Sequence, residues 1–404
     1  MPWPAPESGP PGRAVGEQNR IGSLDGLRGV AALVVVLHHS LLAAPSLADP
    51  YRNITRVPVW SRSWWAVYTP LHLAWGGGEA VYVFFVLSGF VLARPYIGVA
   101  QAQWTPYYAK RAVRLYLPTF GALALAAAVR WSVRRRTFPG ASWWLLARQV
   151  PVTSRGVIND ALLVFAPGTL TGVLWTLRWE VLFSMLLPMF VASAQLLLRR
   201  SGTAVGVGLA LLMLGSRWIV LPSDLFFLPL FGFGVLLASR ERLVREVLTR
   251  LMASPAVKFG VGALALLVAS GHWVIGWSVS RWSPYLRSRL GDLADVTTAL
   301  GCVAIVALVL AGGPLSGVLV RQPCRWLGSR SFSLYLTHEP IVISCAYLAH
   351  GFTVLSASVG VVASLAAAEV LFRLVERPAV ALSRRAGVAT RARLVGQDFA
   401  ERSG

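Results

Sequence analysis

Charged residues are scarce in this chain of 404 residues: Asp, Glu, Lys and Arg make up 14% of it, whereas soluble domains carry about 25%. Acidic residues are the scarcer sign, with 17 Asp and Glu against 38 Lys and Arg, and the only lysines are Lys110 and Lys258. The apolar fraction is 55% and the mean hydropathy is +0.60. This balance argues against a soluble protein and favours a membrane protein.

Cysteine is also rare, and Cys302, Cys324 and Cys345 lie in or beside apolar segments without metal-ligand spacing. They predict buried packing residues, with no disulfide framework and no bound metal. The net charge of +21 does not indicate nucleic-acid binding. The Arg residues stand in short clusters between apolar segments, which is where membrane proteins place them.

The two ends of the chain differ from its middle. Residues 1–19 hold five prolines and no apolar core, which predicts a disordered cytoplasmic head rather than a signal peptide. The Arg-rich residues 381–404 predict an unstructured, basic cytoplasmic tail. Between these ends hydrophobic segments recur with no polar domain among them, so we expect one membrane domain over residues 20–380.

Ten apolar segments are long enough to cross a bilayer core about 30 Å thick. They predict an all-α fold, a polytopic membrane bundle of about ten transmembrane helices. The weakest segment is the sixth, because Pro222 and Pro229 interrupt it. The short apolar stretches 143–146 and 161–165 predict interfacial or re-entrant pieces. The predicted spans are residues 27–47, 77–97, 113–131, 174–196, 204–221, 223–239, 259–277, 296–315, 331–349 and 354–376.

Basic residues predict the orientation. Lys and Arg are more numerous in the head, the tail and the even-numbered loops than in the odd-numbered loops. The positive-inside rule then predicts that both termini are cytoplasmic. The cluster 134–136, three consecutive Arg residues on the predicted outer side, does not fit this pattern.

Charged and imidazole side chains inside an apolar span are costly, so each is a candidate functional residue. The first predicted span carries Arg28, His38 and His39. Eleven residues separate Arg28 from His39, which places both on one helix face about 16 Å apart along the axis. His38 points about 80° away. A snorkelling Arg with a packing His would give the same pattern, but the shared face favours function.

Arg111 and Arg114 lie three residues apart, on one face at the start of the third span. Guanidinium groups bind phosphate with two hydrogen bonds, so Arg28, Arg111 and Arg114 could together hold a phosphorylated ligand at the cytoplasmic surface. Positive-inside charge alone is the other explanation. In the fourth span, Glu180 could orient or charge-balance His39, or it could pair with Arg178 or Arg217.

The last two spans add further polar residues. Tyr335 and His338 face the same way, and we expect them near the cytoplasmic side, where they could meet substrate. Glu369 and Arg373 are four residues apart and predict an ion pair on one helix face, a structural role.

At these residues the sequence resembles the acyltransferase 3 family of membrane acyltransferases over about residues 20–380. The matching motifs occur in the family's order. They are LDGLRGVAALVVVLHH at 24–39, VFFVLSGFVL at 83–92, KRAVRLYLP at 110–118, LWTLRWE at 174–180, FLPLFGFGVLLA at 227–238, LGSRSFSLYLTHEP at 327–340 and LVERP at 374–378. Arg178 and Glu369 depart from the family's pattern, which suggests an acceptor site individual to this protein.

The resemblance implies a ten-helix, multi-pass protein of the bacterial plasma (inner) membrane. It also implies transfer of an acetyl or other short acyl group from acyl-CoA, a co-substrate rather than a bound cofactor, to a hydroxyl of a carbohydrate-containing acceptor, an envelope glycan or a glycosylated metabolite. The family's Arg-and-His motif falls on Arg28 and His39, and its double-Arg motif on Arg111 and Arg114. Some family members append a soluble esterase-like domain that this sequence does not contain. We therefore expect the membrane domain to complete the transfer or to release it to a partner.

We accordingly predict that His39, with Glu180, is catalytic and that His39 is the general base, since its ordinary pKa is near neutral. Arg28, Arg111 and Arg114 are the predicted acyl-CoA site. Asp25, Ser88, Tyr335 and His338 are possible substrate-binding residues, and Ser88 could instead carry the acyl group covalently.

The rival function is a transporter or flippase, whose substrate pathway would also be polar. It would need no acyl donor, and we find no inverted repeat. A silent scaffold is a third alternative.

Overall fold

The computed structural model describes residues 11–52, 57–165, 168–197, 201–218 and 223–403. Within these ranges the regular structure is helical and contains no strand. The helices of ten or more residues are α1 (Pro11–Leu41), α4 (Gly77–Ala93), α5 (Trp104–Ser132), α8 (Leu174–Leu197), α9 (Gly202–Trp218), α10 (Leu228–Ser239), α11 (Glu241–Leu251), α12 (Pro255–Ala269), α14 (Pro284–Leu310), α16 (Gln322–Leu348), α17 (Val354–Leu371) and α18 (Arg377–Ser403). The shorter helices are α2 (Pro45–Ala48), α3 (Arg62–Tyr68), α6 (Trp143–Leu146), α7 (Ser154–Leu162), α13 (Gly271–Ser278) and α15 (Ser316–Leu319), with single turns at Asp49–Tyr51, Pro70–Ala74, Arg94–Tyr96, Ser223–Phe227 and Phe372–Glu376.

The prediction of an all-helical membrane bundle is confirmed, but the count of about ten crossings is not. In the described part of the chain, six helical segments are long and apolar enough to cross a membrane, and a seventh results if α12 and α13, bent by 60°, form one span. α9 and α10 are apolar but shorter. α16 has the length, but His338 and Glu339 in its middle lower its hydropathy.

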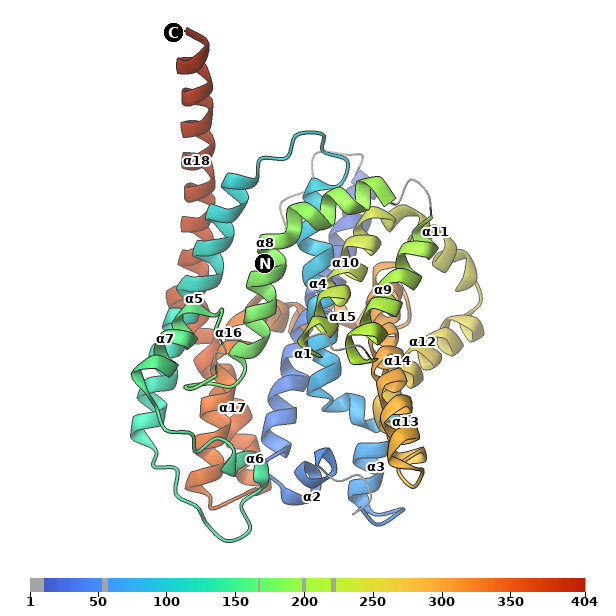
Figure 1. The fold of residues 1–404 in the computed structure, drawn as a ribbon, viewed down its shortest axis with the longest axis vertical. Coiled ribbons are helices and arrows are strands. Elements are labelled where there is room, and N and C mark those ends of the chain that lie inside the picture. Colours follow the sequence, from blue (N-terminus) through green and yellow to red (C-terminus); the bar gives the residue numbers. More distant parts are fainter. Residues whose placement is uncertain (1–10, 53–56, 166–167, 198–200, 219–222, 404) are drawn as a thin grey trace.

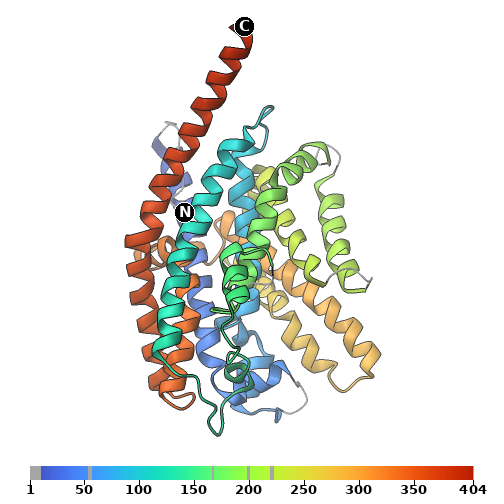
Figure 2. The ribbon, with the colours of Figure 1, turned by 60° about the vertical axis from the view of Figure 1, so that its left-hand side comes forward.

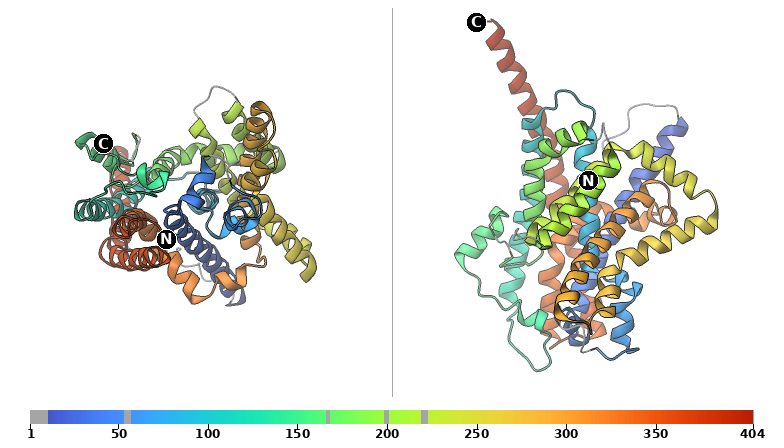
Figure 3. Two further views of the ribbon diagram at one scale, coloured as in Figure 1. Left: turned by 90° about the horizontal axis from the view of Figure 1, so that it is seen from below. Right: turned by 45° about the vertical axis from the view of Figure 1, so that its right-hand side comes forward.

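The helices form two groups around a central pair. α1 and α4 lie in the middle, with α5 and α16 to α18 on one side and α9 to α14 on the other (Figure 1). Seen from below, the same two groups flank the centre (Figure 3). The short helices α2, α3 and α6 close one end of the bundle, and α18 runs beside α5 and projects beyond the other end (Figure 2). The polar residues of α1 therefore face the interior of the bundle.

α1 and α16 touch backbone to backbone. A side-chain carbon on Gly29 would collide with the backbone of Gly328, and one on Gly328 would collide with the carbonyl of Asp25. In lipid, helices associate mainly through close packing, so small residues at a crossing stabilise it. Arg28 bonds to Gly328 of α16, and His39, further along α1, bonds to His338, further along α16. The two helices therefore run in the same direction.

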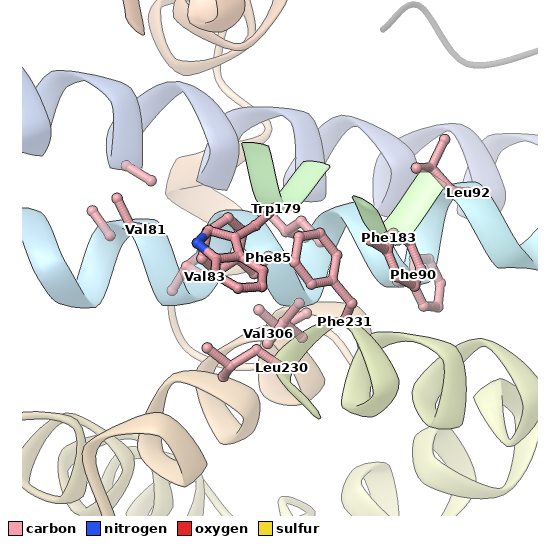
Figure 4. Close-up of a cluster of buried hydrophobic side chains, with 14 of the residues drawn as sticks. Val81, Val83, Phe85, Phe90, Leu92, Trp179, Phe183, Leu230, Phe231 and Val306 are labelled. Atoms are coloured by element: carbon pink, nitrogen blue, oxygen red, sulfur yellow. The ribbon is translucent and has the colours of Figure 1, made fainter. Parts of the chain in front are cut away.

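The largest apolar core lies between α4, α8, α10 and α14. Phe85 packs on Phe231 at 4.7 Å between ring centroids, and Phe183 stacks on Phe231 at 4.4 Å (Figure 4). All three rings are buried. This close packing holds α4, one wall of the site, against the rest of the bundle.

Both ends of the chain are more helical than their composition predicts. α1 begins at Pro11, inside the predicted disordered head, and residues 1–10 lie outside the described residues. The prediction of an unstructured tail is wrong, because α18 continues to Ser403. Arg and Ala are good helix formers, so an Arg-rich sequence need not end a helix. The first turns of α18 also pack on α5, where Gly387 lies against Lys110.

The described residues between α5 and α8, 133–165 and 168–173, form no spanning helix, as predicted, and they set the depth of α8. After α6 and α7 the chain turns, and Asp160 accepts hydrogen bonds from the backbone amides of Gly168, Thr169 and Leu170. The chain then enters the bundle, where residues 171–173 donate hydrogen bonds to Glu339 of α16. α8 therefore begins inside the bundle, not at its surface.

Candidate functional site

A cavity of about 160 Å³, the arginine cavity, lies between α1, α4, α5, α8 and α16. The structure brings six of the predicted site residues into its wall, together with Glu376 from the π-helical turn Phe372–Glu376. These six are Arg28, Ser88, Arg111, Arg114, Glu180 and Tyr335. Six separate motifs of the sequence, counting the one that holds Glu376, thus meet around one space.

Arg28 is held firmly at this cavity. Its guanidinium donates to the hydroxyl of Ser331 and to the carbonyl of Gly328, both at 2.9 Å, and pairs with Asp25 at 2.9 Å. Asp25 therefore positions Arg28 and is not among the residues lining the cavity. The contact with Gly328 depends on the glycine crossing of α1 and α16, which brings the two backbones together.

Arg111 and Arg114 differ in their partners. Arg111 pairs with Glu180 and donates to Ser184 at 2.8 Å. Arg114 has no ion pair or hydrogen bond with any residue that the structure describes, and both the positive charges of Arg28 and Arg111 and the negative charge of Glu376 act on it. A cation in this position attracts an anion, so Arg114 is the most available anion-binding group of the cavity.

Glu180 contacts neither His39 nor the alternative partners Arg178 and Arg217, so that prediction of its pairing is wrong. The prediction started α8 at the membrane surface, which put Glu180 at the depth of His39. Because residues 171–173 are bonded to Glu339, α8 starts deeper, and Glu180 reaches Arg111 instead. Arg217 pairs with Asp295, and the guanidinium of Arg178 lies 5.5 Å from the ring of Trp179.

Glu376 lies in a π-helical turn between α17 and α18. The sequence marked it as a polar residue of the last predicted span, within the motif LVERP, but assigned it no role at the site. Glu376 is buried, accepts hydrogen bonds from the amide of Ser333 at 3.2 Å and its hydroxyl at 2.5 Å, and lines the arginine cavity. Such turns occur frequently at functional sites. On the surface nearby, Glu369 pairs with Arg373, as predicted, and also with Arg330.

His39 and His338 form a hydrogen-bonded pair whose protons can be assigned. Nδ1 of His338 lies 3.0 Å from the carbonyl of Leu334, which can only accept, so this nitrogen carries a proton. In the neutral ring Nε2 of His338 then accepts, and Nδ1 of His39 donates to it at 2.7 Å. Nε2 of His39 is left unprotonated, and no group in the described part of the chain bonds to it. A free imidazole nitrogen of this kind is what a general base requires.

The ring of His39 is also fixed from its face. Trp144 of α6 stacks on it at 5.4 Å, and Arg148 lies 5.4 Å from the ring of Trp144. Arg148 pairs in turn with the buried Glu339 at 2.9 Å. Trp144 and Arg148, which lie in the non-spanning segment between α5 and α8, therefore help to fix the ring of His39.

His338 lies in the middle of α16 and not near one end of the bundle, so the prediction of its depth is wrong. It is fully buried, bonds to His39 and is not among the residues lining the arginine cavity. The prediction started the span at residue 331, whereas α16 begins at Gln322. Nine further residues, about 14 Å of helix, carry His338 into the middle of the bundle.

His38 differs from His39 as predicted, since it faces another element. Its Nδ1 lies 3.0 Å from the carbonyl of Trp75, before α4. The hydroxyl of Tyr51 lies 3.4 Å from this nitrogen and 3.4 Å from Nε2 of His72. Burial lowers the pKa of His72 and raises that of Tyr51, so both are neutral near pH 7.

A second cavity of about 360 Å³, the aromatic cavity, lies next to the arginine cavity. His38 and His39 line it, and Tyr335 and Val81 line both cavities. Tyr335 is held there by a 2.8 Å hydrogen bond to Thr176. His39 therefore lies in the wall of the aromatic cavity, and Tyr335 and Val81 are the residues that this wall shares with the arginine cavity.

The aromatic cavity contains residues that were not selected from the sequence: Glu79, Arg217, His272, Trp273 and Asp295. The same signal that identified His39 was present, because Glu79 and His272 lie inside predicted apolar spans and Asp295 directly precedes one. They were missed because each stands alone in its own segment, and only the packing of α4, α9, α13 and α14 brings them together.

Comparison with known proteins adds the following. A family model described as "Acyltransferase domain", of the acyltransferase 3 type, matches residues 21–373. The chain is 25% identical over 362 residues to the putative peptidoglycan O-acetyltransferase YrhL of Bacillus subtilis, covering 80% of this chain and 49% of that protein. It is 23% identical over 404 residues to the peptidoglycan O-acetyltransferase OatA of Listeria monocytogenes, covering 89% and 55%. The chain spans about half the length of these relatives. No solved structure matches it.

Proposed function

Because the chain belongs to the acyltransferase 3 family, we propose that it transfers an acetyl or other short acyl group from acyl-CoA to a hydroxyl of a carbohydrate-containing acceptor. The two relatives are named for O-acetylation of peptidoglycan, which supports an acetyl group and a glycan acceptor. The family also supports the broader class of acyl transfer, independently of the donor.

One observation carries the proposal. His39, whose Nε2 is left unprotonated by the bond to His338, lines the aromatic cavity, and this cavity shares Tyr335 and Val81 with the arginine cavity. An acceptor hydroxyl reaching His39 loses its proton to this nitrogen as its oxygen attacks the thioester carbonyl. The carbon–sulfur bond then breaks, and the CoA sulfur leaves with the proton held by His39. His338 keeps the ring of His39 in the tautomer that this step needs.

The donor enters through the arginine cavity. Its volume of about 160 Å³ fits a narrow chain rather than a nucleotide, so the pantetheine arm lies inside and the phosphates remain near Arg28, Arg111 and Arg114. Arg114 is available for a phosphate without breaking an existing ion pair. The Arg28-to-His39 separation of about 16 Å along α1 is the distance over which an extended arm carries the thioester.

The proposed setting is the plasma membrane, with both termini cytoplasmic, so that the arginine cavity faces the cytoplasmic supply of acyl-CoA. The excess of Lys and Arg on that side motivates this orientation. Reporter fusions after Leu145 and Arg385 test it. An outside signal at the first and an inside signal at the second are expected, and the reverse pattern contradicts the orientation.

The function is tested with the purified protein in lipid nanodiscs, acetyl-CoA labelled in the acetyl group, and isolated peptidoglycan glycan strands. We expect label in ester linkage on the glycan, released by mild base, together with stoichiometric free CoA. If CoA is neither bound nor released, the donor assignment is wrong. Label movement across a vesicle membrane without ester formation would instead favour a transporter.

A further inference from the structure

The aromatic cavity has the composition of a site for a small polar ligand. Ligand pockets commonly measure about 300 to 1,000 Å³ and combine aromatic walls with a few polar groups. At 360 Å³ this cavity is in that range, and Trp175, Tyr82 and Trp273 supply aromatic surface. Trp175 is 40% exposed although it lies within a helix of the bundle. A sugar ring, with its apolar faces and hydroxyl edges, matches such walls.

Its polar groups form a network that leaves one donor unused. Asp295 accepts from His272 at 2.5 Å through one oxygen and from Arg217 at 3.0 Å through the other. Nε of Arg217 is buried and has no hydrogen-bond partner among the described residues. A buried donor without a partner is costly, and an oxygen of a bound ligand would satisfy it.

Glu79 supplies the complementary acceptor. It is buried at the start of α4, and one oxygen accepts from Trp273 Nε1 at 3.0 Å. The nearest basic group to its other oxygen is Nε2 of His72, at 3.8 Å, beyond hydrogen-bond length. This oxygen can therefore accept from a ligand hydroxyl.

We propose that the aromatic cavity is the acceptor subsite and binds an N-acetylated sugar, an inference that rests on the proposed function. Trp175 packs against the sugar ring, Glu79 accepts from a hydroxyl and Arg217 donates to the N-acetyl carbonyl. Asp295 holds Arg217 and His272 in place. A sugar in this cavity has its remaining hydroxyl beside His39, which lines the same space.

Binding to the purified full-length protein in nanodiscs tests the proposal, with a chitin oligosaccharide as the sugar probe and CoA as the donor-side probe, each titrated by calorimetry. Glu79→Gln should weaken binding of the oligosaccharide by about ten-fold or more, the loss of one hydrogen bond to a charged group. Asp295→Asn should also weaken it, because the ion pair that holds Arg217 is lost. CoA affinity should stay within about two-fold, because neither residue lines the arginine cavity.

The matched control is Asp292→Asn, the same change one turn earlier on α14 at a residue outside both cavities, and it should bind both probes normally. Trp175→Ala, which removes no hydrogen bond, keeps the test decisive if a buried-charge variant does not fold. Failure of the wild-type protein to bind the oligosaccharide, or unchanged affinity in folded Glu79→Gln and Trp175→Ala, overturns the proposal. If the wild-type protein does not bind CoA, the donor assignment of the proposed function is refuted instead.

Discussion

The two cavities differ in how their charges are arranged. In the arginine cavity three guanidinium groups face two carboxylates, and Arg114 has no partner among the described residues. In the aromatic cavity Asp295 pairs with Arg217 and His272, and rings form much of the wall. A surplus cation suits a phosphorylated ligand, whereas a balanced network with spare hydrogen-bonding atoms suits a neutral, hydroxylated one. The difference argues for two substrates, one in each cavity, with His39 in the wall of the aromatic cavity.

The largest expected effect concerns His39, the candidate general base in the wall of the aromatic cavity. His39→Ala should lower acyl transfer by about 10² to 10⁴, because it removes the general base. His38→Ala should retain most activity, since His38 is bonded to the carbonyl of Trp75 and not to His338. Initial rates should be compared in membranes containing equal amounts of each variant, with acyl-CoA near saturation.

Expression level and detergent-extracted monodispersity serve as the control for folding of both histidine variants. A well-folded His38→Ala protein without activity, beside an active His39→Ala protein, would show that the catalytic face of α1 has been misassigned.

The next effect tests the charge of the arginine cavity alone. Arg114→Ala should weaken CoA binding by about 1.5 to 3 kcal/mol, the contribution of a hydrogen bond to a charged group, and leave the affinity for the oligosaccharide unchanged. Arg114 is a cleaner probe than Arg111, whose removal would also strand Glu180. CoA titration of the purified protein gives the value.

Lys110→Ala is the control, because Lys110 lies one turn earlier on α5, is exposed and is not among the residues lining either cavity. If both variants lose the same affinity, the effect comes from overall positive charge and not from the cavity.

The smallest effect is expected at Ser88. It lines the arginine cavity, but the proposed mechanism passes the acyl group directly to the acceptor. Ser88→Ala should therefore change the transfer rate by less than about two-fold, and Ser88→Thr likewise if it folds. A large loss in a folded Ser88→Ala protein, with a covalent acyl adduct on Ser88 detected in the wild type by mass spectrometry, would favour the acyl-carrier alternative.

Much of the site could be predicted because its parts lie within single helices. Arg28 and His39 share a face through helical periodicity alone, and α16 covers that face. The predicted depths of Glu180 and His338 were wrong. The residues at which α8 and α16 begin depend on contacts between distant segments, and the sequence of one segment does not reveal them. For α8 the deciding contact is the bond of residues 171–173 to Glu339.

The sequence by itself determined the helical class of the protein, its membrane character and six polar residues of the arginine cavity, because hydropathy, periodicity and motif order are local properties of the chain. Only the tertiary structure decided that His39 pairs with His338, that Glu180 serves Arg111, and that α4, α9, α13 and α14 enclose a second cavity. The physical reason is that these contacts join segments up to 299 residues apart. A buried polar group in lipid must find a partner, but its own segment does not specify which helix supplies it.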